Sequence, residues 1–465
     1  MQSYRMEHDF IGEMKIEDDK YYGVQTKRAM ENFPISRVPI STFPIFVKAL
    51  AHIKKAAAEA NMDLGVLDPG IAKAIIAASD EVIKGKLLSQ FPVDVIQGGA
   101  GTSCNMNANE VICNRALEIY GKKKGEYQYI HPNNHVNKSQ STNDVYPTAI
   151  RITTYMQSLE LEKELLRFKK ALEEKAAEFK HVIKMGRTQL QDAVPMSLGQ
   201  EFLAWATTIG EDVERLRDSR SLLLEINMGG TAIGTGILAP KTYSEHVTKH
   251  LAENTGIPFV SASDFIEATQ DCGCYVQYSG MIKRISCKLS KICNDLRLLS
   301  SGPRTGIGEI NLPPRQPGSS IMPGKVNPVI PEVVNQVAFE IVGNDVTVTM
   351  AAEAGQLELN AMEPIIAYSL SCSNIHLTNA LKTLTDNCIK GITANEARAR
   401  ALVDGSIGIV TILMPVLGYE KCSQVARIAL ETGKSVKDIL LENHLLSASE
   451  IDEIMKPENM AKSIR

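Results

Sequence analysis

The chain has 465 residues, of which 44% are hydrophobic and 22% are charged, and its formal net charge at pH 7 is -4. This length and composition allow a large buried core and predict about two to four domains. No block of like charges suggests a nucleic-acid or membrane partner, and no run reaches the roughly 18 apolar residues that a membrane span needs.

Residues 1–12 are polar and charged and lack the apolar core of a signal peptide. The nine cysteines are scattered and odd in number, and the only close pair, Cys272 and Cys274, has no second pair or histidine cluster at zinc spacing. We therefore expect a soluble cytoplasmic protein with ordinary thiols and no metal centre.

Helix signals dominate the chain. Over 152–183 apolar residues recur at steps of mostly three and four, with Lys and Glu between them, which predicts a long amphipathic helix. The same pattern returns over 202–227, 275–299 and 331–389, whereas strand signals are few and short. The sequence predicts a mainly α protein with a central bundle of long helices, and such helices often pack across a subunit interface.

Five segments rich in Gly, Ser, Thr and Asn interrupt the helical stretches: 97–109, 133–147, 186–191, 227–236 and 302–328. Their polarity comes from hydroxyls and amides, which suit gripping a ligand. Helix caps and turns select the same residue types, so capping is the alternative for each segment. Five such segments in one chain favour a shared ligand site.

The stretch 318–328, GSSIMPGKVNP, has the clearest chemical meaning. Its glycines and prolines suit a closing lid with a few defined shapes. Lys325 can neutralise a carboxylate, and Asn327 can donate a hydrogen bond to it. Ser319 could act as a base only if a cation, backbone N–H groups and exclusion of water made its hydroxyl more acidic. We expect this stretch to eliminate a small group from a dicarboxylic acid.

Three other segments offer neutral polar groups. Thr102 follows a Gly-rich turn at the expected start of a helix, where backbone N–H groups attract anions. The hydroxyls and amides of 139–144 precede a long helix, and Thr188 and Gln189 follow one. None of these groups changes charge near neutral pH, so they would bind or orient a substrate. The glycine-rich stretch 229–236 lacks a surrounding βαβ unit and is not expected to bind a nucleotide.

Taken together, these segments resemble the aspartase/fumarase superfamily, from YYGVQT at 21–26 to SIG at 406–408. GSSIMPGKVNP is the signature of that superfamily and is shared by class II fumarases. Four other features resemble the aspartase branch: AGTS at 100–103, QSTND at 140–144, Gln189 where fumarases place a histidine, and VIPEVVNQ at 329–336. The resemblance implies reversible deamination of L-aspartate to fumarate and ammonia. It implies no required cofactor and leaves Mg²⁺ activation open.

The resemblance also implies residue roles. Ser319 would remove the proton from Cβ, and charge would build on the β-carboxylate as an aci-carboxylate before ammonia leaves. The implied contacts of the β-carboxylate are Thr102, Ser141, Thr142 and Ser320. The implied contacts of the α-carboxylate are Lys325 and Asn327. Asn143, Thr188 and Gln189 would surround the amino group, and Met322 would shape the lid side of the pocket.

In quaternary terms, the resemblance implies a homotetramer whose sites take loops from three subunits. It also implies three domains, which we place at 1–141 (N-terminal), 142–395 (central helical bundle) and 396–465 (small C-terminal helical domain). Two alternatives remain. One is fumarase activity, or lyase activity on a substituted aspartate. The other is an all-α scaffold without chemistry, as in some lens crystallins of the superfamily, against which the intact Ser319, Lys325, Asn327 and Thr188 argue.

Overall fold

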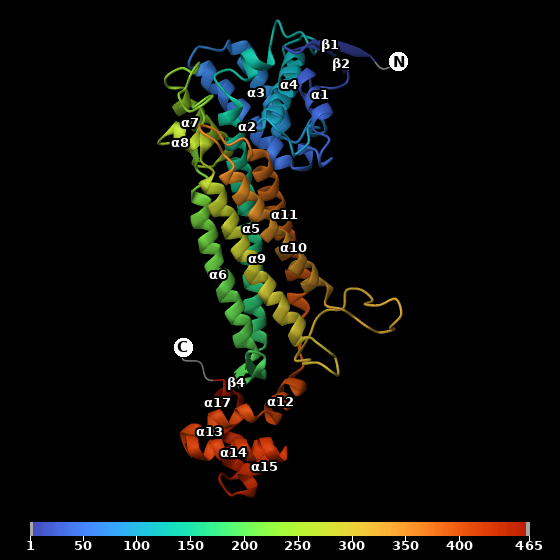
Figure 1. Ribbon diagram of the computed structural model, residues 1–465, viewed down its shortest axis with the longest axis vertical. Coiled ribbons are helices and arrows are strands. Elements are labelled where there is room, and N and C mark those ends of the chain that lie inside the picture. The colour runs from blue at the N-terminus through green and yellow to red at the C-terminus, as the bar shows by residue number, and fades with distance from the viewer. Residues whose placement is uncertain (1–2, 462–465) are drawn as a thin grey trace. The chain divides into compact units, whose positions relative to one another are not determined.

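The computed structural model describes residues 3–461 and is predominantly helical (Figure 1). The chain divides into two compact units. Unit 1 contains the chain up to Leu161 together with Arg215–Arg284 and Glu340–His376, and unit 2 contains Glu162–Glu214, Ile285–Phe339 and the chain from Leu377 onwards.

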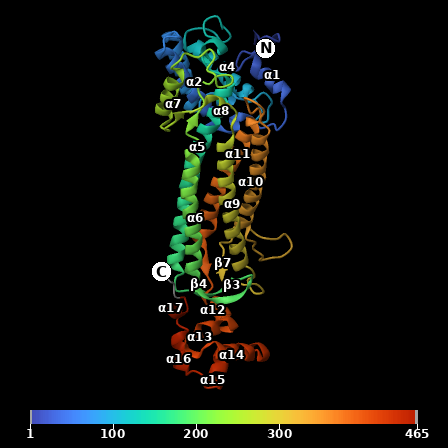
Figure 2. The ribbon, with the colours of Figure 1, turned by 60° about the vertical axis from the view of Figure 1, so that its left-hand side comes forward.

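Five long helices run side by side as a bundle (Figures 1 and 2), which confirms the prediction of a mainly α protein built on long helices. They are α5 (Thr142–Glu178), α6 (Leu198–Ser221), α9 (Gly273–Leu299), α10 (Val329–Glu353) and α11 (Glu363–Asn387).

Three of the expected helical stretches differ from the observed ones. The helix expected over 202–227 ends at Ser221, and Glu225–Ile226 form a short strand. The helix expected over 152–183 begins earlier, at Thr142, and also ends earlier, at Glu178. Ile183, the last residue of the expected helix, is the first residue of a strand. The single stretch expected over 331–389 is two helices. Asn360 separates them, since its Nδ2 donates to the carbonyls of Ala351 and Ala352 at the end of α10 and so satisfies groups that a continuing helix would have used.

Unit 1 surrounds the beginning of α5 with shorter elements. Its remaining helices are α1 (Val24–Asn32), α2 (Pro44–Asp63), α3 (Pro69–Ile83), α4 (Thr102–Ile119), α7 (Tyr243–Thr255) and α8 (Phe265–Gln270), with the short turns η1 (Ile40–Thr42), η2 (Leu88–Gln90) and η3 (Pro132–Val136). The hairpin of β1 (Tyr4–His8) and β2 (Glu13–Glu17) is antiparallel, and β5 (Glu225–Ile226) pairs in parallel with β6 (Val260–Ser261).

Helix α4 lies at the centre of this unit and is buried on almost every side, polar residues included. Its Glu110 is 2% exposed and accepts N–H bonds from Gly23, Gln25 and Thr26, which hold the beginning of α1. Burial raises the pKa of Glu110 to about 7, and the hydrogen bonds from α1 oppose that shift. A buried carboxylate therefore replaces an ordinary cap at the α1 N-terminus.

Unit 2 joins a hairpin to the C-terminal helices. The hairpin consists of β3 (Ile183–Thr188) and β4 (Gln191–Ser197), and a second pair joins β7 (Ile310–Asn311) to β8 (Thr393–Ala394). The C-terminal elements are η4 (Ile389–Gly391), α12 (Glu396–Gly405), η5 (Ile407–Ile409), α13 (Val410–Leu417), α14 (Tyr419–Thr432), α15 (Val436–Glu442), α16 (Ala448–Ile454) and α17 (Pro457–Met460). Ile183 and Met185 of β3 belong to the same hydrophobic core as these helices.

The domain boundaries expected from the sequence stay a prediction. Helix α5 begins at Thr142 and α12 begins at Glu396, the residues at which the expected second and third domains begin.

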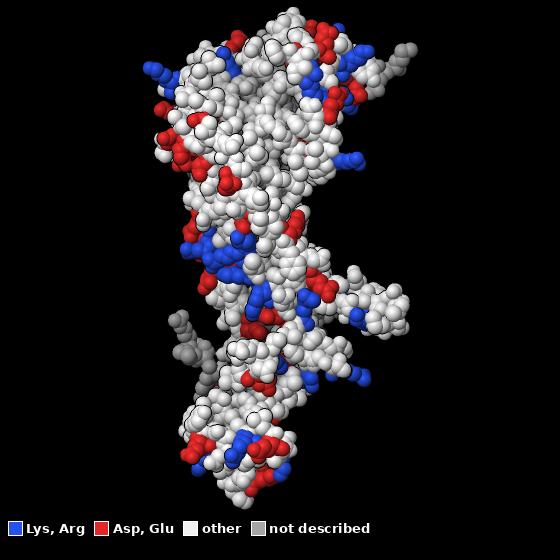
Figure 3. Space-filling model, viewed as in Figure 1, with Lys and Arg blue, Asp and Glu red and all other residues white. Residues whose placement is uncertain are grey.

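Charged side chains are unevenly spread over the face that Figure 3 draws. Acidic and basic side chains are mixed at its two ends, and a group of Lys and Arg side chains gathers midway along it. Among residues 3–461, no single helix is long and apolar enough to cross a membrane, although α12 and the stretch Ile407–Leu417 pass a length and composition test as a pair bent by 74°.

The glycine-rich segment 227–236 packs closely against the beginning of α8. Gly234 has a φ of +89°, and a Cβ added to it would lie 2.4 Å from backbone atoms of Phe265 and Ile266. Only glycine fits this position, because both the backbone angle and the space exclude a side chain.

We therefore expect Gly234→Ala to lower the free energy of unfolding by at least about 2 kcal/mol, from left-handed backbone strain and overpacking together. Thermal melting of the purified protein measures the effect. The matched control is Gly280→Ala in the interior of α9, where an added Cβ meets nothing within 4 Å of the chain. That control should melt at or slightly above the wild-type temperature, and a Gly234→Ala protein that melts with the wild type would contradict the packing.

Candidate functional site

The predicted site residues fall into three groups. In unit 1 lie Thr102, Ser141, Thr142 and Asn143, at the beginnings of α4 and α5. In unit 2 lie Thr188 and Gln189 on the β3–β4 hairpin, and Ser319, Ser320, Met322, Lys325 and Asn327 on the segment between α9 and α10. Among the described residues of unit 2, no hydrogen bond joins the hairpin residues to those of the segment between α9 and α10.

The residues at the start of α5 cap that helix, so the capping alternative holds for this segment. Ser141 Oγ accepts the N–H of Asn143 at 3.2 Å, and Asp144 Oδ1 accepts the N–H of Ser141 at 3.0 Å. A hydroxyl that accepts a hydrogen bond keeps its own proton for another partner. Capping by Ser141 therefore leaves it able to donate to a carboxylate.

Asn143 is oriented by the glycine-rich segment. Its Nδ2 donates to the carbonyl oxygen of Ala232 at 2.7 Å. Because a carbonyl oxygen can only accept, the amide nitrogen must face Ala232, and Oδ1 is left on the other side as an acceptor. Segment 227–236, to which the sequence assigned no ligand, thus fixes the orientation of a predicted site residue.

Thr102 is the first residue of α4, as the sequence predicted. Its Oγ1 donates to the carbonyl oxygen of Gly99 at 2.7 Å, and its side chain is exposed. Gly101, the residue before it, has a φ of +87°, and a Cβ there would lie 2.2 Å from the Tyr146 ring. The turn that presents Thr102 therefore requires glycine at 101.

Thr142 is the most buried member of the predicted set, at 8% exposure, and it contacts a residue that the sequence did not single out. Asn105 Nδ2 donates to Thr142 Oγ1 at 3.0 Å, and Lys54 Nζ donates to Asn105 Oδ1 at 2.6 Å. Burial lowers the pKa of Lys54 to about 7, while the nearby charge of Asp144 opposes that shift.

Lys54 could have been found from helical spacing. It lies on α2 at the positions of one buried face, four residues after Leu50 and three before Ala57, both fully buried. A lysine on such a face must have polar partners inside the protein. The neighbouring Lys55, which pairs with Asp80 nearer the surface, hid that signal in the sequence.

The β3–β4 hairpin presents Thr188 and Gln189 at an exposed tip. Its two-residue turn consists of Gln189 and Leu190, with φ of +54° and +61°. Two-residue hairpins favour such angles but usually fill them with Asn and Gly, because a left-handed side-chain residue costs about 1–2 kcal/mol. Strain of this kind is typical of functional sites. Arg187 anchors the hairpin through Glu309, a fully buried carboxylate, at 3.0 Å.

The segment between α9 and α10 projects away from both helices (Figures 1 and 2). Its stretch 318–328 is closed at the neck, because the N–H of Gly318 donates to the Lys325 carbonyl at 2.7 Å and Asn327 Nδ2 donates to the Gly318 carbonyl at 2.8 Å. One amide hydrogen of Asn327 thus has a structural partner, and the other remains for a carboxylate. Ser320, Met322 and Lys325 are exposed.

Ser319 lies at the base of this stretch and is half-buried. Its Oγ accepts the backbone N–H groups of Ile321 at 3.1 Å and Met322 at 3.0 Å. Donors aimed at a hydroxyl oxygen stabilise its deprotonated form. The backbone N–H groups that a serine base requires are therefore present.

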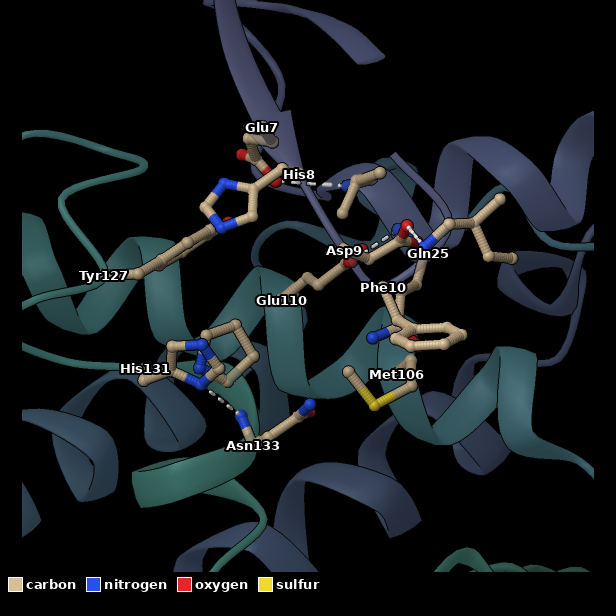
Figure 4. Close-up of a pocket in the computed structure, with 13 residues that line it drawn as sticks. Glu7, His8, Asp9, Phe10, Gln25, Met106, Glu110, Tyr127, His131 and Asn133 are labelled. Carbon is tan, nitrogen blue, oxygen red and sulfur yellow. Dashed lines mark hydrogen bonds between the residues drawn. The ribbon is translucent and has the colours of Figure 1, made fainter. Parts of the chain in front are cut away.

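A separate cavity of about 590 Å³ in unit 1 is not lined by any predicted site residue (Figure 4). Glu7 and Glu110 in its wall already accept backbone N–H bonds from α1, and His131 Nδ1 accepts the N–H of Asn133 at 3.0 Å. These polar groups serve the fold. Among residues 3–461, no cluster of three or more His, Cys, Asp or Glu side chains could hold a metal ion.

Comparison with known proteins relates the whole chain to lyases. Residues 12–343 match the family described as lyase, and residues 409–462 match the fumarase C C-terminus. An aspartate ammonia-lyase from Helicobacter pylori (strain ATCC 700392 / 26695) is 57% identical over 456 residues, which cover 98% of this chain and 97% of that protein.

Two crystal structures share the fold over essentially the full length. Fumarate lyase:delta crystallin from Brucella melitensis bound to cobalt has a TM-score of 0.97 and 52% identity, covering 99% of this chain and 100% of that chain. Recombinant class II fumarase from Schistosoma mansoni has a TM-score of 0.95 and 35% identity, covering 100% of both chains. The backbone is thus common to lyases with different leaving groups, while sequence identity is higher to the aspartate ammonia-lyase.

Proposed function

Because the chain belongs to the lyase family, we propose that it deaminates L-aspartate reversibly to fumarate and ammonia. The observation that carries this proposal is the 57% identity with an aspartate ammonia-lyase over nearly the whole of both chains, against 35% with a class II fumarase. The chain is therefore an enzyme that breaks a carbon–nitrogen bond.

In the proposed mechanism, Ser319 removes a proton from Cβ of aspartate. The electron pair of the broken C–H bond moves toward the β-carboxylate, which becomes a doubly charged aci-carboxylate. Collapse of this species forms the double bond of fumarate, and the protonated α-amino group leaves as neutral ammonia with the electron pair of the broken C–N bond. The two N–H groups on Ser319 Oγ support its role as base.

The remaining groups bind and orient the substrate. We assign the β-carboxylate to Thr102, Ser141, Thr142 and Ser320, and the α-carboxylate to Lys325 and Asn327. We assign the amino group to Asn143, Thr188 and Gln189, with Met322 on the lid side. Hydroxyl donors aimed at the β-carboxylate bind more strongly as its charge increases, so they favour the transition state over the substrate.

The amide groups suit an amine as leaving group. Asn143 presents Oδ1 because its Nδ2 is held by Ala232, and an acceptor oxygen complements the N–H donors of an amine. Gln189 likewise offers an acceptor without a competing positive charge. This chemistry requires no cofactor, and Mg²⁺ activation remains an alternative.

We further propose a homotetramer in which each site takes loops from three subunits. The exposed apolar face of α10 supports it: Val342, Val346 and Met350 recur at four-residue spacing and are 37%, 54% and 68% exposed. Such a contiguous apolar face is typical of an interface. A cytoplasmic location is supported by the nine cysteines, all of which are free thiols.

The proposed reaction is tested by following the ultraviolet absorbance of fumarate with L-aspartate and, separately, with L-malate. We expect absorbance to rise with aspartate and to stay flat with malate. Fumarate from malate alone would reassign the chain as a fumarase, the candidate that the 0.95 TM-score with the class II enzyme keeps open.

Ser319→Ala should lower kcat for aspartate by about 10²–10⁴-fold, the usual contribution of a positioned general base. Steady-state kinetics and light scattering together should show an inactive but correctly assembled protein. The matched control is Ser320→Ala on the next residue, which removes one donor to the β-carboxylate but keeps the base, so kcat should fall less than in Ser319→Ala. A Ser319→Ala enzyme with near wild-type kcat would disprove the assignment of the base.

Met350→Glu should disrupt the tetramer, because it places a charge on the most exposed residue of the proposed apolar interface. Light scattering should give about four times the 50.9 kDa chain mass for the wild type and a smaller species for the variant, with loss of activity. The control is Leu430→Glu, at an exposed apolar residue (73%) on α14 outside the proposed interface, and it should remain tetrameric. A wild-type protein with the mass of one chain would rule out shared sites.

A further inference from the structure

A short chain of buried side chains runs behind the beginning of α5. Lys54 Nζ donates to Asn105 Oδ1 at 2.6 Å, and Asn105 Nδ2 donates to Thr142 Oγ1 at 3.0 Å. All three residues belong to unit 1, and their exposures are 0%, 1% and 8%. Lys54 and Asn105 have no role in the mechanism described so far.

The direction of these hydrogen bonds is determined by chemistry. An ammonium group has donors and no acceptor, so the oxygen of Asn105 must face Lys54 and its NH₂ group must face Thr142. Thr142 Oγ1 therefore accepts. A hydroxyl has a single proton, and among residues 3–461 that of Thr142 donates to no partner. The proton of Thr142 is directed away from Asn105, toward whatever lies in front of α5.

The remaining contacts of Lys54 keep this direction fixed. Its other two donors go to Asn137 Oδ1 at 3.1 Å and Gln140 Oε1 at 2.9 Å, so all three ammonium protons face amide oxygens. Asn137 is itself held, since its Nδ2 donates to the Gln140 carbonyl at 3.2 Å. None of these partners carries a charge, so no carboxylate in direct contact neutralises the ammonium.

We propose that Lys54 and Asn105 are positioning residues that direct the Thr142 hydroxyl as a donor to the substrate's β-carboxylate. This inference rests on the proposed function, in which Thr142 binds that carboxylate. A donor whose orientation is set before the reaction stabilises the aci-carboxylate without reorganisation, and the positive charge behind it adds to the effect. Two residues outside the site thereby contribute to the transition state through Thr142.

Asn105→Asp tests the direction of the hydrogen-bond chain with almost no change in size. The new carboxylate can pair with Lys54, but it offers an acceptor in place of a donor to Thr142. It does the same to Asn137 Oδ1, which Asn105 Nδ2 also contacts at 3.1 Å and which the Asn109 control below shares. The Thr142 proton then turns back toward residue 105 and away from the substrate. We expect kcat for aspartate to fall about 10²-fold, as when one oxyanion donor is lost, with a smaller change in KM.

Asn105→Ala separates this effect from loss of packing. Without a partner at 105 the Thr142 hydroxyl can rotate and still donate to the substrate part of the time. The proposed positioning role therefore predicts a smaller fall in kcat for Asn105→Ala than for Asn105→Asp. A purely structural role predicts the opposite order, since alanine removes more of the side chain, and that order would overturn the proposal.

Thr142→Val supplies the second arm of the test. It should lower kcat to a similar extent, and adding Asn105→Asp to it should cause no further fall, because the effect of residue 105 acts through the Thr142 hydroxyl. Additive losses would overturn the proposal. If Asn105→Asp does not fold, Asn105→Ala combined with Thr142→Val tests the same coupling between the two positions.

Asn109→Asp is the matched control. Asn109 lies one turn further along α4, is fully buried and donates to Asn137 Oδ1 at 3.1 Å, but it does not contact Thr142. It should keep the wild-type kcat, and an equal fall would assign the effect to buried charge alone.

The outcomes also separate this inference from the site assignment on which it rests. Wild-type kinetics in Thr142→Val would remove Thr142 from the site. An impaired Thr142→Val enzyme beside a fully active Asn105→Asp enzyme would leave the site intact and overturn the positioning role.

Discussion

The geometry of the candidate site in unit 1 depends on one buried carboxylate, Asp144. It is fully buried and accepts the backbone N–H groups of Ser141, Gly229 and Thr231, which belong to two segments distant in the sequence. Burial raises the pKa of Asp144 to about 7, and those hydrogen bonds oppose the shift. Asp144 thereby joins the start of α5 to the glycine-rich segment, and the orientation of Asn143 follows from that junction.

The polar groups around the start of α5 are mostly neutral hydroxyls and amides. Their interaction with the proposed β-carboxylate strengthens as its charge increases, provided that they are already oriented toward it. Orientation must then come from the protein. Ala232 supplies it for Asn143 through a carbonyl, and Asn105 supplies it for Thr142 through an amide.

Much of this arrangement could be predicted from the sequence, for physical reasons that differ between elements. The long helices follow from apolar periodicity, and the position of Thr102 at a helix start follows from the turn before it. Helix ends were harder, because the break after α10 depends on Asn360, whose partners are known only once the chain is folded. Lys54 was missed because the neighbouring Lys55 hid the signal of its helical spacing, and its three partners come from distant segments.

In the stretch 318–328, local hydrogen bonds orient the polar groups, whereas at the start of α5 the orienting partners come from distant segments. The neck of this stretch is closed by local bonds between Gly318, Lys325 and Asn327, and the N–H pair on Ser319 is equally local, so the base can form within a single loop. What local bonds cannot supply is exclusion of water, because Ser320, Met322 and Lys325 are exposed in the chain. A serine base needs both conditions. In the proposed mechanism, the loop must therefore be covered before Ser319 can act, and in the proposed tetramer neighbouring subunits would supply that cover only where the substrate also binds.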